Sequence, residues 1–90
     1  MSNNLHGGDP NELRDFARDL ERARSVLLRI NTELSQRISG NLRWEGPDAF
    51  VFKHAWRSSY SPVITQTAAM LEETAVLIKA QAAEQESASA

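Results

Sequence analysis

The chain has 90 residues, no cysteine and a formal charge of -2 at neutral pH. This length allows one domain at most, and the lack of cysteine excludes a disulfide framework and a thiolate metal site. The ten Lys and Arg alternate with twelve Asp and Glu instead of forming a basic patch. We therefore expect neither nucleic acid nor an anionic membrane as the main partner. Without disulfides or a thiolate metal site, side-chain packing must stabilise the fold.

The N-terminal residues and the apolar runs bear on targeting. No apolar run approaches the roughly 18 residues that a membrane-spanning helix needs, so we expect no stable membrane insertion. Residues 1–8, MSNNLHGG, have no basic start and no apolar centre. They predict a flexible N-terminal tail with no cleavable secretion signal, so export of this chain requires a route independent of a signal peptide.

The first predicted element is a helix over about residues 9–39. Asp9 is typical of an N-cap and Pro10 of a first helical residue. Apolar residues then recur in steps of three and four, which predicts a stripe along one helix face. Its members are Leu13, Phe16, Leu20, Ala23, Leu27, Ile30 and Leu34, joined in the middle by Val26 and Leu28. Gly40 is predicted to end the helix in the left-handed conformation.

A turn over residues 40–46 precedes the second predicted helix, at about residues 47–83. Gly46 suits the cap position and Pro47 the first helical position. A second stripe with helical spacing follows, and it indicates the buried seam of this helix. Its members are Ala49, Phe52, Trp56, Tyr60, Val63, Thr67, Met70, Thr74 and Leu77. Further apolar residues lie outside this narrow seam: Phe50, Val51, Ile64, Leu71, Val76 and Ile78.

Two features modify the second helix. Pro62 removes one backbone hydrogen bond and clashes with the preceding turn, which predicts a kink, with two helices broken at Ser61 as the alternative. Residues 84–90 are mostly small or polar, and they predict a flexible C-terminal tail.

Together these elements predict an all-α fold, an antiparallel helix-turn-helix hairpin over residues 9–83. A short connection favours antiparallel neighbours, and one hairpin leaves much of each apolar face in water. We therefore expect two hairpins to dimerise into a four-helix bundle. The residues expected in the core or the dimer interface are Leu20, Leu27, Ile30, Leu34, Phe52, Trp56, Tyr60 and Val63.

The sequence contains no recognisable catalytic pattern. His6 and His54 have no partner at a metal-ligand spacing, and the serines lack the glycines of a nucleophile elbow. No Gly-rich phosphate loop is present. We expect no enzyme, no cofactor and no metal ion.

A Trp-X-Gly motif, Trp44-Glu45-Gly46, lies at the midpoint of the chain between the two predicted helices. With this length, no cysteine and no signal peptide, the whole chain resembles the Trp-X-Gly (WXG) family of type VII secretion substrates, the early-secreted-antigen-like helical hairpins. The resemblance implies a four-helix bundle formed by a homodimer or with a sister protein. It also implies export by a membrane-embedded secretion ATPase, with Trp44 and Gly46 as part of the export signal.

In that family a Tyr-X-X-X-Asp or Glu signal near the C-terminus of the partner completes the export signal. Here the only tyrosine is Tyr60, inside the second helix. The C-terminal region instead contains Ala82-Ala83-Glu84-Gln85, which resembles endings of family variants that lack the tyrosine. The chain therefore visibly carries the Trp-X-Gly half of the signal.

Three functions compete at this stage. The first is an exported dimer or export adaptor that acts through protein contacts, with a cytoplasmic pool. The second is a cytoplasmic partner that shields a toxin or effector through the same face. The third is a generic helical scaffold or DNA-associated dimer with a coincidental Trp-X-Gly motif.

Overall fold

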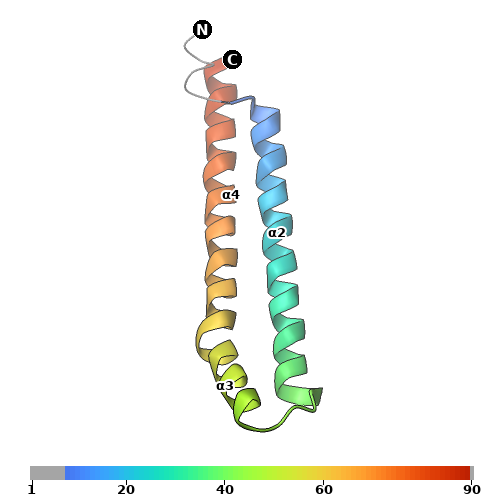
Figure 1. Cartoon of the computed structure of the whole chain (residues 1–90). Helices are drawn as coiled ribbons and strands as arrows, with labels where there is room; N and C mark the ends of the chain where they lie inside the picture. Colours follow the sequence, from blue (N-terminus) through green and yellow to red (C-terminus); the bar gives the residue numbers. More distant parts are fainter. Residues whose placement is uncertain (1–7, 90) are drawn as a thin grey trace.

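A computed structural model describes residues 8–89, in which two helical arms run antiparallel and meet at one tip (Figure 1). The first arm is α2 (Pro10–Gln36), which continues into a π-helical turn, η1 (Arg37–Asn41). The second arm consists of α3 (Pro47–Ala55), a second π-helical turn, η2 (Trp56–Tyr60), and α4 (Ser61–Ser89). The predicted all-helical hairpin is confirmed for this part of the chain.

The hairpin is a thin rod that measures 64 × 18 × 14 Å. A helix with its side chains is about 10–12 Å across, so the rod is two helices wide and one helix thick. Each helix therefore has one neighbour along most of its length, as α2 and α4 do in Figure 1. Two broad faces of the hairpin, one on each side, remain available to solvent or to partners.

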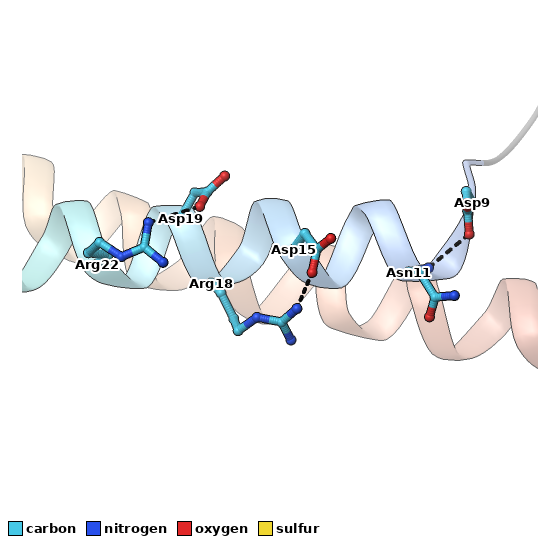
Figure 2. A network of polar contacts seen from close by, with 6 residues as sticks. All are labelled: Asp9, Asn11, Asp15, Arg18, Asp19 and Arg22. Carbon is cyan, nitrogen blue, oxygen red and sulfur yellow. Dashed lines mark hydrogen bonds and ion pairs between the residues drawn. The ribbon is translucent and has the colours of Figure 1, made fainter.

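The start of α2 is capped as the sequence predicts. The Asn11 N–H donates to Asp9 Oδ1 at 2.9 Å (Figure 2). The Leu13 N–H donates to the Asp9 carbonyl at 2.9 Å. Pro10 occupies the first turn, where its missing N–H costs nothing. The cap fixes where the first arm begins.

The two glycines of the connection have different roles. Gly40 belongs to η1 and does not have a positive φ, so its predicted left-handed conformation is wrong and the helix continues to Asn41. Gly46 has φ +105° and ψ 178°, a conformation that L side chains rarely adopt. Its carbonyl accepts the Phe50 N–H at 3.0 Å, which makes Gly46 the N-cap of α3. Gly46 therefore fixes where the second arm begins.

The effect of Pro62 appears one turn earlier in the chain. The Ser61 N–H donates to the Trp56 carbonyl, five residues back, which is the hydrogen bond of a π-helical turn. Widening the turn in this way gives room to the proline ring, which would clash with the Ser58 carbonyl in an uninterrupted α-helix. The second arm thus stays helical past Pro62, with one additional residue in the turn η2.

The additional residue rotates α4 by one position relative to α3. Ala49 in α3 and Trp56 at the start of η2 are buried, and Ala68, Ala75 and Ala82 are buried after the π-helical turn. The half-buried Ile64, Leu71 and Ile78, which the sequence placed outside the seam, flank these alanines. The α4 seam therefore lies one residue later than the predicted stripe through Val63, Met70 and Leu77.

The first arm contributes a less apolar seam. Its buried residues are Ala17 and Ile38, and between them Arg24 and Asn31 are half-buried at seven-residue intervals. Five of the seven buried residues described are alanines, and four of these belong to the second arm. The hairpin core is consequently narrow and rich in alanine.

The C-terminal segment also differs from the prediction. α4 continues to Ser89, so residues 84–89 are helical and not a flexible tail, whereas Ala90 lies outside the described residues. Two features hold this end of α4 against the first arm: Ala82 is buried, and the Glu86 carboxylate pairs with Arg14. The predicted tail over residues 1–8 lies outside the described range except for Gly8.

Candidate functional site

Seven of the eleven exposed large apolar side chains described lie in two rows beside the seam. On the second arm, Tyr60, Val63, Met70 and Leu77 are between 52% and 64% exposed. On the first arm, Phe16 is 50% exposed, and Ile30 and Leu34 are about 40% exposed. Each row lies one residue before the positions that face the other helix. We call these two rows together the apolar face.

Ion pairs across the hairpin mark one of its two sides, and both apolar rows lie on the other side. Arg14 pairs with Glu86, Glu21 with Lys79, and Arg24 Nε lies 2.8 Å from Glu72 Oε1. On α4 the pairing residues directly follow Leu71, Ile78 and Gln85 of the seam. Because the helices are antiparallel, residues just after the seam on both arms share one face, and residues just before it share the other. The apolar face is therefore continuous across the two helices.

Two threonines within the apolar face present little polarity to a partner. The Thr67 hydroxyl donates to the Val63 carbonyl and the Thr74 hydroxyl to the Met70 carbonyl, both at 2.8 Å. With their hydroxyls satisfied inside the helix, these side chains expose mainly methyl groups. Covering the face with another apolar surface would leave no threonine hydroxyl without a partner.

The opposite face of the first arm is strongly charged. Asp15 pairs with Arg18, and Asp19 pairs with Arg22 at 3.1 Å, along the outer surface of α2 (Figure 2). All four side chains are at least 60% exposed, so each pair contributes only a few tenths of a kcal/mol. This face, which we call the polar face, suits contact with water.

The apolar face reaches the tip through a row of aromatic rings. The Trp44 and Phe52 ring centroids lie 5.6 Å apart at an interplanar angle of 43°, and Phe52 and Tyr60 lie 6.4 Å apart. Trp44 remains 39% exposed. Trp44 thus contacts the second arm through Phe52 of α3. The motif tryptophan forms the end of the apolar face.

Trp56, in contrast, connects the two arms. It is only 7% exposed, and its Nε1–H donates to Ser35 Oγ at 2.9 Å. One turn further along, the Ser61 hydroxyl donates to Asn31 Oδ1 at 2.8 Å. These polar contacts bridge the arms around the turn η2.

The predicted core and interface residues are therefore spread over different environments. Trp56 is buried in the hairpin, and the half-buried residues at the margin of the seam are Leu20, Leu27 and Phe52. Ile30, Leu34, Tyr60 and Val63 lie on the apolar face. Sequence reasoning missed the seam residues Ala68, Ala75 and Ala82, although their seven-residue spacing was a usable signal.

Metal binding and membrane insertion have no visible basis in the described residues. Within residues 8–89, no cluster of three or more His, Cys, Asp or Glu could hold a metal ion. His54 is exposed on α3, and His6 lies outside the described residues. None of the described helices is sufficiently long and apolar to cross a membrane.

The geometry thus presents one continuous apolar face that ends at the Trp-X-Gly tip. Comparison with family models, curated proteins and solved structures found no match to this chain.

Proposed function

We propose that the chain is a non-enzymatic protein that acts as a dimer through the apolar face, as an exported protein or export adaptor of the type VII secretion kind. One observation carries the proposal: the apolar face runs along both helices and has no cover within the hairpin. Exposed apolar surfaces of this extent are typical of protein interaction sites.

A second hairpin is the simplest cover for this surface. Two such faces placed together form a four-helix bundle, in which rows such as Val63, Met70 and Leu77 enter a shared core. The predicted partners are a second copy of this chain or a sister protein with the same architecture. The exposed Trp44, at the end of the apolar face, is the proposed contact for a secretion ATPase.

Sedimentation equilibrium at micromolar concentrations tests the dimer. We expect a dimer for the unmodified chain and a monomer for Met70→Glu, because that carboxylate would be buried in the bundle. Val76→Glu is the matched control, since Val76 is as exposed as Met70 but follows the seam residue Ala75 and so lies on the other side. A monomeric unmodified chain, or equal effects of both variants, would contradict the proposed dimer interface.

Mass spectrometry of the culture medium of the native cell tests export. The proposal expects the chain in the medium, and less of it there for Trp44→Ala at an unchanged cellular level. Arg43→Ala is a suitable control, because it changes the neighbouring exposed side chain. Retention of the chain inside the cell as a complex with one toxin would favour the shielding function instead.

A further inference from the structure

A groove of about 430 Å³ lies where the end of the first arm meets the α3–η2 segment. Ile38, Phe50 and Trp56 form its apolar lining, and Lys53 and Arg57 form its charged edge, with serine hydroxyls between them. Phe50 is 72% exposed, the highest value among the large apolar side chains described. We call this feature the junction groove.

The junction groove does not belong to the apolar face. Phe50 and Arg57 directly follow the buried Ala49 and Trp56, the same offset that places Glu72 and Lys79 on the polar side of the seam. The apolar face lies at the opposite offset. A dimer formed through the apolar face would therefore leave the junction groove accessible.

The charges of the rod are distributed unevenly. Residues 29–65 contain five Arg or Lys and three Asp or Glu, a net charge of +2, whereas the rest contains five and nine, a net charge of -4. All five cations outside residues 29–65 form ion pairs: Arg14, Arg18, Arg22, Arg24 and Lys79.

The five cations within residues 29–65 differ in that they lack such ion pairs in the described part of the chain. Within residues 8–89 no ion pair forms with Arg29, Arg37, Arg43, Lys53 or Arg57. Lys53 and Arg57 thus border an apolar groove without a carboxylate to neutralise them. A ligand with both an apolar body and negative charge would satisfy both properties.

We propose that the junction groove binds an acidic segment of a partner protein. The segment inserts a large apolar side chain between Phe50 and Trp56 and places carboxylates against Lys53 and Arg57. A buried apolar anchor surrounded by charge-assisted contacts is the arrangement that commonly supplies affinity in peptide recognition. Two cations beside an apolar lining favour such a segment over nucleic acid, whose binding depends on many phosphate contacts.

The experiment begins with a display library of short random peptides selected against the full-length chain. We expect the enriched peptides to combine Asp or Glu with Leu, Phe or Trp. Their affinity is then measured by tryptophan fluorescence in a Trp44→Phe variant, in which Trp56 is the remaining tryptophan and reports on the groove. Peptides without acidic residues, or no enrichment, would overturn the proposal, as would binding that leaves Trp56 fluorescence unchanged.

Charge reversal provides the decisive comparison. Lys53→Glu/Arg57→Glu should weaken peptide binding by about tenfold or more, because attraction becomes repulsion. The control Arg29→Glu/Arg43→Glu changes the net charge equally but alters no groove residue, and its effect should stay below about threefold. Equal losses in both variants, or tighter binding of a single-stranded oligonucleotide than of the peptides, would refute a groove specific for acidic peptides.

Two further measurements separate this inference from folding and from the proposed dimer. Circular dichroism should show unchanged helicity in the charge-reversed variant, because both side chains lie at the groove edge. Phe50→Ala, a neutral change at an exposed site, should also weaken binding about tenfold through loss of the anchor contact. Sedimentation should still report the dimer in both variants, so failure of peptide binding leaves the dimer proposal independently testable.

Discussion

The Trp56 indole N–H donates to Ser35 Oγ at 2.9 Å, and this bond links the second arm to the first. Trp56 is almost completely buried, whereas Trp44 at the tip is 39% exposed. Trp56 therefore stabilises the fold, whereas Trp44 presents part of its ring at the surface.

Replacing each tryptophan by alanine tests this division. Trp56→Ala should destabilise the hairpin by about 3–5 kcal/mol, because it leaves a cavity and removes the bond to Ser35. Trp44→Ala should cost about 1–2 kcal/mol, because its ring packs against Phe52 but remains 39% exposed. Urea denaturation of both variants measures the difference, and equally large losses would identify Trp44 as a core residue.

Gly46 and Gly40 form a matched pair for the connection. Gly46→Ala should destabilise the fold by about 1–3 kcal/mol, because φ +105° is strained for an L side chain even though an added Cβ meets no atom within 4 Å. Gly40→Ala also meets no atom within that distance, and its helical backbone should make it neutral or stabilising by up to about 1 kcal/mol. Thermal melts followed by circular dichroism compare them. A Gly46→Ala variant as stable as Gly40→Ala would show that the conformation of Gly46 is not required.

The alanine seam predicts sensitivity to larger side chains. Ala75 is 1% exposed between the arms, so Ala75→Leu should destabilise the hairpin by about 1–3 kcal/mol through overpacking. Ala69→Leu is the control on the same helix, because Ala69 is exposed and its effect should remain within about 0.5 kcal/mol. Denaturant titrations decide between them, and tolerance of Ala75→Leu would mean that the arms can separate.

Leu27 connects the seam to the apolar face. It is half-buried within the hairpin and would be fully covered in the proposed bundle. Leu27→Asp should therefore remove the dimer and lower the melting temperature together, because it buries an unpaired charge. Ser25→Asp introduces the same carboxylate at an exposed position of α2 and should leave both properties unchanged. Sedimentation and thermal melts are the measurements, and an unchanged melting temperature for Leu27→Asp would contradict the prediction.

The sequence by itself determined the elements of the fold. Helical spacing located both arms, Asp9 and Pro10 set the start of the first, and Gly46 and Pro47 set the start of the second. These features depend on local backbone chemistry, which a short stretch of residues contains in full. The Trp-X-Gly tip could be located for the same reason.

Tertiary structure decided which faces meet. Apolar spacing selected the row through Val63, Met70 and Leu77, yet the π-helical turn before Pro62 adds one residue and turns Ala68 and Ala75 toward α2 instead. On the first arm, the seam includes charged residues such as Arg24, which pairs with Glu72 across the hairpin. A prediction based on apolar spacing omits such residues. The spacing of apolar residues indicates which helix faces avoid water. Which of these faces packs against the neighbouring helix depends on the rotation of each helix about its axis and on contacts between residues distant in sequence.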